Sequence, residues 1–216
     1  MRSPRTHLSG DSFIARASNQ LPQVITAWIL IRHVEIALRH HIDPIMRERH
    51  DQLVGDPDWL LTPHAQLKSL HPSISRARSR VAQDHGQLNN DAVLNALPFG
   101  FWSALLSRRY QALLWSDLCR AFAHAPARNS DLVSRRVHRL GVLRNQIAHH
   151  SPVDLARLPR TIDDGLTLIS YMAPDAVDPV RLMLDLFRFD GGEQLQGANV
   201  GIAVDNTESA RSLEQQ

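Results

Sequence analysis

The spacing of apolar residues constrains the fold of this chain more than any other feature. Val24, Trp28, Ile31 and Leu38 recur at helical spacing and predict a long amphipathic helix over about 21–42. No alternating strand pattern of useful length appears in the 216 residues. We therefore expect an all-α protein that folds as a helical bundle.

Further helices are expected wherever helical spacing returns between turn signals. Asn89 or Asn90 can cap a short helix, Ser130 can cap a longer one, and Pro152 ends that longer helix. The aromatic segment 98–102 is expected to form a corner between helices. The helices expected after the first cover about 72–84, 91–97, 107–122, 130–150, 154–172 and 176–187.

One domain is expected over 20–189, between a flexible N-terminus (1–19) and a low-complexity polar tail (190–216) that we expect to be disordered. The single cysteine, Cys119, excludes an intrachain disulfide and fits a reducing compartment. The N-terminus has no apolar signal-peptide core, and Arg32 is among the charges that interrupt the longest apolar run. We therefore expect a cytoplasmic protein with no membrane contact.

The charges are unevenly distributed along the chain. Residues 1–160 carry 21 basic against 12 acidic side chains, whereas residues 161–216 carry 3 against 10. Nearly all the basic residues are arginines, whose guanidinium groups pair well with phosphates. Codon bias in a G+C-rich genome is the alternative explanation for the arginines. The composition is compatible with RNA binding and does not demonstrate it.

Two apolar stripes each contain one charged residue. Arg144 falls in the stripe that begins at Val133 and continues through Val137 and Leu140. Glu35 is the single charge in the stripe of the first helix. Since an unpaired charge is costly to bury, we expect the two helices to pack so that Glu35 orients Arg144. Arg39, one turn from Glu35, is a competing partner, and a purely structural ion pair is the alternative interpretation.

The helix that carries Arg144 is expected to end in two histidines, His149 and His150, just before Pro152. His149 would lie about 140° around the helix from Arg144, on a rim shared with Asn145. The negative end of the helix dipole favours an imidazolium there. A histidine that changes protonation near neutral pH, beside a fixed arginine, suits general acid–base chemistry on a phosphodiester. A favourable helix cap without catalysis is the alternative.

The segment LRNQIAHH (143–150) resembles the Arg-x(4–6)-His signature of HEPN domains, in which a polar residue follows the arginine. Within that superfamily the chain resembles the Abi-like proteins, named for abortive phage infection. His40 departs from the family pattern, which often has asparagine there. The other segments that carry the resemblance are HVEIALRHHI (33–42), LPFGFWSALLSRRYQALLW (97–115), HHSPV (149–153) and ISYMAPDA (169–176).

The resemblance implies a helical HEPN fold, often dimeric, in which two copies of the motif form a composite cleft. Many such proteins are endoribonucleases that need neither metal nor cofactor and act as toxins or antiphage effectors. It implies catalytic roles for Arg144, Asn145 and His149, with Glu35 and His150 supporting them. An antitoxin protein is a possible partner. The rival interpretation is a non-catalytic HEPN-like bundle that binds RNA or protein.

In the expected reaction the ribose 2′-OH attacks the adjacent phosphorus and gives a 2′,3′-cyclic phosphate and a 5′-OH. His149 would serve as general base or acid. Arg144 would stabilise the phosphorane oxygens, and Asn145 would orient the phosphate or the imidazole. Glu35 would position Arg144, and His150 is a substitute base or a phosphate contact.

Three other groups of residues have weaker functional interpretations. The arginines of the motif helix, Arg135, Arg136 and Arg139, could guide RNA to the motif or form an ordinary solvated face. The histidines of the first helix have no carboxylate or cysteine at ligand spacing, so metal binding there is not favoured. The tryptophans are interpreted as core residues rather than as base-stacking ones. The histidines in question are His33, His40 and His41, and the tryptophans are Trp28, Trp59, Trp102 and Trp115.

Overall fold

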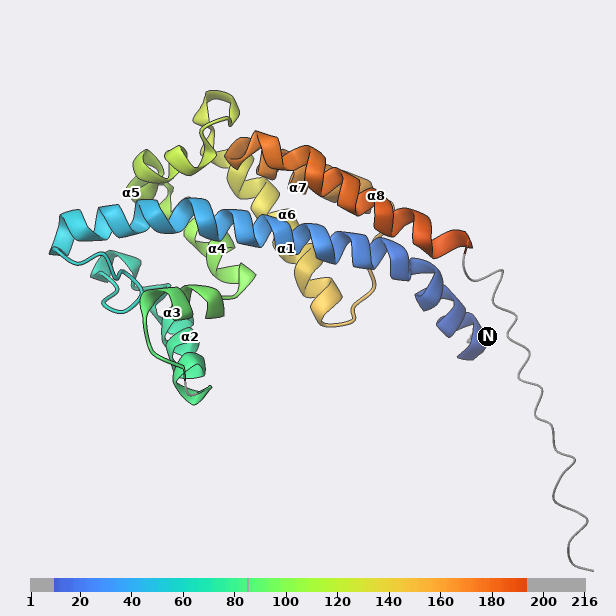
Figure 1. The fold of residues 1–216 in the computed structure, drawn as a ribbon, viewed down its shortest axis with the longest axis horizontal. Coiled ribbons are helices and arrows are strands. Elements are labelled where there is room, and N and C mark those ends of the chain that lie inside the picture. The colour runs from blue at the N-terminus through green and yellow to red at the C-terminus, as the bar shows by residue number, and fades with distance from the viewer. Residues whose placement is uncertain (1–9, 85, 194–216) are drawn as a thin grey trace, which may run out of the picture.

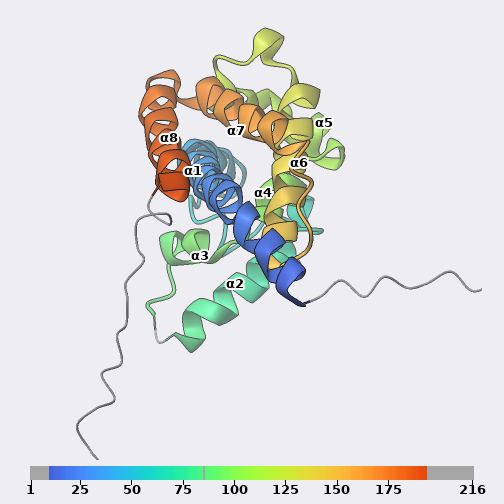
Figure 2. The ribbon, with the colours of Figure 1, turned by 90° about the vertical axis from the view of Figure 1, so that its right-hand side faces the viewer.

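A computed structural model describes residues 10–84 and 86–193, and within these ranges every regular element is a helix. This confirms the all-α expectation. The longest element, α1 (Gly10–Val54), runs the length of the molecule (Figure 1). Seen along its axis, α1 has α8 on one side, α7 above it and α6 on the other side (Figure 2).

Helix α1 is longer at both ends than its apolar spacing predicts. It begins at Gly10, within the segment expected to be a flexible N-terminus, while residues 1–9 lie outside the described part. At the other end it continues through Pro44, because the residues that follow return to the core, Met46 among them. It stops where Gly55 adopts a left-handed conformation, with φ of 75°.

The remaining helices lie close to the expected ones, apart from the following differences. The helix expected from about residue 154 begins only at Leu158. The segment expected to be an aromatic corner is itself helix α4, and the helix expected over 107–122 ends four residues early and continues as a 3₁₀ turn. Helix α8 continues past residue 190, and the rest of the expected tail, 194–216, lies outside the described residues. The elements are α2 (His71–Gln83), α3 (Asn90–Ala96), α4 (Phe99–Leu105), α5 (Arg108–Leu118), α6 (Ser130–Ala148), α7 (Leu158–Met172) and α8 (Val177–Glu193).

Asparagine side chains cap two of these helices. Asn89 accepts a hydrogen bond from the backbone N–H of Ala92 at 2.8 Å and caps α3, as one of the two expected candidates. Asn129 accepts from Leu132 at 3.1 Å and caps α6. The expected cap of α6, Ser130, is instead its first residue, because the side chain one position earlier already satisfies the free N–H.

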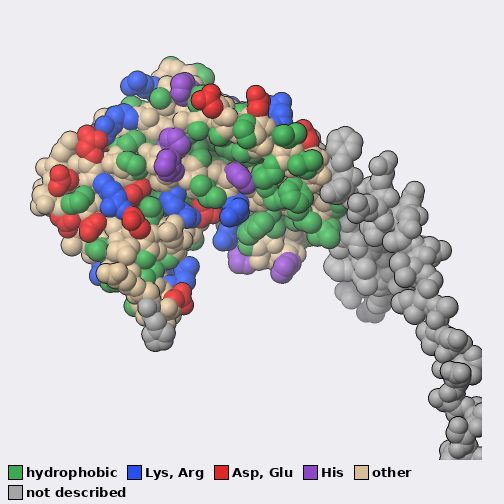
Figure 3. Space-filling model, in the orientation of Figure 1, with side chains coloured by type: hydrophobic (Ala, Val, Ile, Leu, Met, Phe, Trp, Pro, Cys, Tyr) green, Lys and Arg blue, Asp and Glu red, His purple; other side chains and the backbone are tan. Residues whose placement is uncertain are grey.

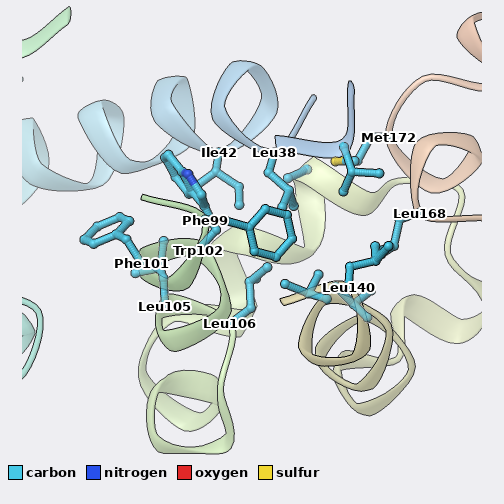
Figure 4. Close-up of a cluster of buried hydrophobic side chains, with 14 of the residues drawn as sticks. Leu38, Ile42, Phe99, Phe101, Trp102, Leu105, Leu106, Leu140, Leu168 and Met172 are labelled. Atoms are coloured by element: carbon cyan, nitrogen blue, oxygen red, sulfur yellow. The ribbon is translucent and has the colours of Figure 1, made fainter. Parts of the chain in front are cut away.

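The core forms where α1 crosses the aromatic helix α4. Phe99 and Trp102 are almost completely buried and lie beneath Leu38 and Ile42 of α1 (Figure 4). Burial of large aromatic side chains contributes strongly to stability, so this crossing anchors the fold. The expected core position of one tryptophan is wrong: Trp28 is 42% exposed. The buried stripe of α1 lies to one side of it and consists of Ala27, Leu30, Ile31, Val34, Leu38 and Ile42.

Helices α2 and α3 form a lobe that attaches to the C-terminal half of α1 (Figure 1). Asp43 of α1 is buried and accepts hydrogen bonds from Trp59 Nε1 at 2.8 Å and from Asn90 Nδ2 at 3.3 Å. Arg47, one turn later, pairs with Asp43 at 2.6 Å and also with Asp91. Because each buried polar group finds a partner, this network fixes the lobe on α1.

The stretch Gln20–Val54 of α1 includes a window with mean hydropathy 1.3, long and apolar enough to cross a membrane by composition alone. The core helix of a soluble protein passes the same test, and 33% of this window is buried inside the bundle. Contacts of α1 with α5, α6, α7 and α8 bury part of its apolar surface, while Leu21, Trp28 and Ile36 stay exposed. Location in the cytoplasm stays a prediction.

Candidate functional site

The residues of the Arg-x(4–6)-His motif lie at the C-terminal end of α6. Arg144 is half-buried, whereas Asn145, His149 and His150 are exposed. The helix ends at Ala148, so the two histidines follow its last turn instead of forming part of it. His149 still donates its backbone N–H to the carbonyl of Asn145 at 3.0 Å. Both imidazoles are therefore accessible to a ligand.

His150 adopts a backbone conformation that usually belongs to glycine. Its φ is 53°, and its N–H donates to the carbonyl of Ile147 at 3.1 Å. The next N–H, of Ser151, donates to Gln146 at 2.8 Å, which completes a Schellman cap. A non-glycine residue is strained by roughly 1 kcal/mol or more in this conformation. The cap therefore fixes the backbone at His150 at an energetic cost.

Arg144 contacts an aromatic ring and has no acidic partner. Its guanidinium carbon lies 6.0 Å from the centre of the Trp28 ring on α1, within the range of a cation–π interaction. No carboxylate of the described residues lies within 4.0 Å of it. An arginine held in this way is free to pair with a phosphate.

Glu35 does not make the expected ion pair with Arg144. It pairs instead with Arg39 at 3.3 Å, the competing partner that the helical spacing offered. Arg39 also donates to Asn95 Oδ1 of α3 at 2.8 Å. Burial raises the pKa of Glu35, while the positive charges of Arg39 and Arg144 act in the opposite direction. Glu35 therefore acts on Arg144 only through its charge, whereas the side chain in contact with Arg144 is Trp28.

Two of the three arginines expected to guide RNA are engaged inside the bundle. Arg139 donates two hydrogen bonds to Asp164 of α7, at 2.5 and 2.8 Å, and Arg136 approaches the same carboxylate at 3.4 Å. Arg136 also lies over the ring of Tyr171, 5.5 Å from its centre. Of the three, only Arg135 is exposed, while Arg136 and Arg139 are half-buried. Arg136 and Arg139 therefore join α6 to α7.

Asp164 of α7 was not among the residues expected to be functional. It is buried, with a relative exposure of 6%. The signal was present: Asp164 lies among the apolar residues Ile162 and Leu168 of α7, as Glu35 does on α1. A lone carboxylate in an apolar stripe predicts a cationic partner on the neighbouring helix. The same argument applied to α7 would have paired Asp164 with an arginine of α6.

Two of the three histidines considered on α1 make local hydrogen bonds. His33 donates from Nδ1 to the carbonyl of Ile29 at 2.7 Å, and His41 donates to Ala37 at 2.9 Å. The rings of His40 and His41 meet edge to face at 5.3 Å. Across residues 10–84 and 86–193, no group of three or more histidine, cysteine or acidic side chains is arranged to hold a metal ion.

An open hollow of about 440 Å³ lies between α1 and the start of α7. Its walls are mostly apolar, with Pro22 and Thr26 on one side and Leu158 and Ile162 on the other. None of the motif residues lines it. The hollow and the motif are therefore separate features of the surface.

No known protein-family model matches the chain, and no curated protein or solved structure matches it significantly.

Proposed function

We propose that the chain is an endoribonuclease of the HEPN type, related to the Abi-like proteins, which cleaves RNA by 2′-OH attack without a metal. One observation carries the proposal. The half-buried guanidinium of Arg144 has no carboxylate within 4.0 Å among the described residues, and it lies on the same helix end as Asn145 and the exposed His149. An unpaired, fixed cation beside exposed imidazoles suits a phosphodiester that gains negative charge as it reacts.

The reaction requires one proton to leave the 2′-OH and another to reach the 5′ oxygen that departs. His149 accepts the first proton or delivers the second. Arg144 stabilises the phosphorane oxygens, and Asn145 orients the phosphate by hydrogen bonding. His150, whose backbone is fixed by the helix cap, contacts the phosphate or substitutes for His149. Glu35 is a positioning residue that acts on Arg144 through charge.

Two copies of the chain are proposed to build the cleft together. Arg144 contacts Trp28 of α1, whereas His149 follows the end of α6 and is exposed, so that a second copy can approach it. A composite site takes Arg144 from one protomer and His149 from its partner. Arg135, the exposed arginine on the same helix, would contact the RNA backbone outside the cleft.

The biological role proposed with this activity is that of a cytoplasmic toxin or antiphage effector, with an antitoxin protein as a possible partner. The same geometry supports one alternative. If the site needs two copies, a bundle that fails to pair would bind RNA or protein without cutting it.

Inducible expression in a bacterial host tests the proposal, with growth and total RNA integrity measured together. The wild type should arrest growth and fragment RNA, and Arg144→Ala or His149→Ala should abolish both effects. His138→Ala is the matched control, because His138 is an exposed histidine on the same helix, and it should behave as the wild type. Soluble wild-type protein that also leaves a pool of structured RNAs intact after purification would favour the non-catalytic alternative.

A further inference from the structure

The N-terminal half of α1 presents a row of large side chains to solvent. Leu21, Ile25, Trp28 and Ile36 are 54%, 39%, 42% and 45% exposed, and Arg32 among them is also exposed. We call these five residues the open face of α1. Their spacing of three, four and seven residues places them on one side of the helix.

Further along α1, the lobe of α2 and α3 covers the same side of the helix. Arg39, seven residues after Arg32, reaches Asn95 of α3. Arg80 of α2 donates to the backbone carbonyl of Ala96 at 3.2 Å, next to that contact. The surface is hollowed between this lobe and the rest of the bundle, with Lys and Arg side chains on both sides (Figure 3). The open face of α1 therefore continues towards a basic hollow.

The cations around the open face lack acidic partners. Among the described residues, no carboxylate lies within 4.0 Å of Arg32, Arg80 or Arg144. Arg39 alone is neutralised, by Glu35. Several unpaired guanidinium groups along one surface favour a polyanionic ligand over an apolar one. A second copy centred on Arg32 and Arg80 by two-fold symmetry would bring these two arginines close to their own equivalents, which repel.

Trp28 joins this basic surface to the motif. Its ring contacts the guanidinium of Arg144 while 42% of the residue stays exposed. Arg32 lies one helical turn away on the same side. An exposed indole next to unpaired arginines is the combination that binds single-stranded nucleic acid, because bases stack on the ring while arginines pair with phosphates. In a duplex, both faces of each base are already stacked.

We propose that Trp28 is a stacking platform for one base of a single-stranded RNA, and that Arg32 and Arg144 hold the phosphates beside that base. Trp28 is then a positioning residue, which places the scissile phosphate against Arg144 within reach of His149. The inference rests on the proposed function only in taking RNA as the substrate, since binding can be measured without cleavage.

Fluorescence anisotropy with a labelled single-stranded RNA oligonucleotide tests the inference, with His149→Ala in every protein to prevent cleavage. Adding Trp28→Ala should raise the dissociation constant about 5- to 150-fold, the usual loss when one stacked base loses its platform. Trp28→Phe should restore most of the affinity. Ile25→Ala, a truncation on the same face, is the matched control and should leave affinity within about twofold.

The salt dependence separates stacking from charge. Arg32→Gln should reduce the slope of log affinity against log salt by about 0.7, as expected for one lost phosphate contact on a single strand. Trp28→Ala should weaken binding and leave that slope unchanged. A duplex of the same sequence should bind without sensitivity to Trp28→Ala. If Trp28 only supported the fold, Trp28→Ala and Arg32→Gln would not differ in this way, with one variant changing the affinity alone and the other changing the salt slope.

Equal affinity of Trp28→Ala and its parent, or no RNA binding by the parent, would overturn the inference. A change in oligomeric state on Trp28→Ala, measured by light scattering, would overturn it in favour of a protein interface. The two proposals fail separately. Normal RNA binding by Trp28→Ala with intact cleavage in the wild type rejects only the platform. Impaired binding by Trp28→Ala with an inert wild type rejects only the nuclease.

Discussion

Replacing Asp164 by asparagine should destabilise the protein more than any other single change of charge at the α6–α7 interface. The carboxylate accepts two hydrogen bonds from Arg139 and lies 3.4 Å from Arg136. Asparagine keeps the shape of the side chain but removes its charge, and its NH₂ group would face the N–H donors of Arg139. Removing one partner of a buried pair costs about 3–5 kcal/mol. The Arg139 side chain is 38% exposed and can regain water, so we expect about 2–3 kcal/mol here.

For a chain of this size, a loss of 2–3 kcal/mol lowers Tm by roughly 4–12 °C. Thermal unfolding followed by circular dichroism measures the shift. Asp163→Asn is the matched control, because its exposed neighbouring carboxylate makes no ion pair among the described residues, and it should change Tm by less than about 2 °C. Equal melting of the two variants would refute the conclusion that Arg136 and Arg139 hold the bundle together, and would make them available to RNA.

Three further predictions concern packing, charge and backbone strain. Gly165→Ala should be less stable than Gly100→Ala by about 1–3 kcal/mol in urea unfolding, because a Cβ at Gly165 would lie 2.7 Å from buried Leu30 and Gly100 faces open space. Equal stabilities would contradict the close approach of α1 to α7. Burial raises the pKa of Glu35 above its ordinary 4.5. The folded state therefore holds this proton more tightly, and the wild type should lose stability relative to Glu35→Gln as pH rises from 4.5 through the raised pKa; a constant difference across that range would contradict this. His150→Gly should relieve the left-handed strain and stabilise the protein by about 0.5 kcal/mol while reducing RNA cleavage, whereas a clear loss of stability would show that His150 supports the cap.

Much of the fold could be predicted because helical spacing and capping signals are local. The bounds of α2, α3 and α6 are close to the expected ones. The length of α1 at its C-terminal end was underestimated, and a proline such as Pro44 normally disfavours a continuing helix. Here the burial of the next residues, Ile45 and Met46, outweighs that local preference. Tertiary packing decides such cases, and no local pattern reveals it.

The sequence indicates which residues belong to the candidate site, but it predicts poorly which of them touch one another. Spacing placed Arg144 on the side of α6 that faces α1, and the structure agrees. It also treated Trp28 as core, because an apolar stripe has a width of more than one position and Trp28 lies at its edge. The helical spacing left two cations as partners for Glu35, because it does not give the distance between α1 and α6. In the structure Glu35 pairs with Arg39 of its own helix, at 3.3 Å.

The central claim is that the motif cleaves RNA through the neighbouring 2′-OH. The most direct measurement uses an oligonucleotide that the purified wild type cuts, resynthesised with a single 2′-deoxy sugar at the cleaved position. With chelator present throughout, cleavage at that bond should disappear while binding persists, and the original products should end in a 2′,3′-cyclic phosphate and a 5′-OH. Continued cleavage of the deoxy substrate, or products that carry a 5′-phosphate, would contradict the account.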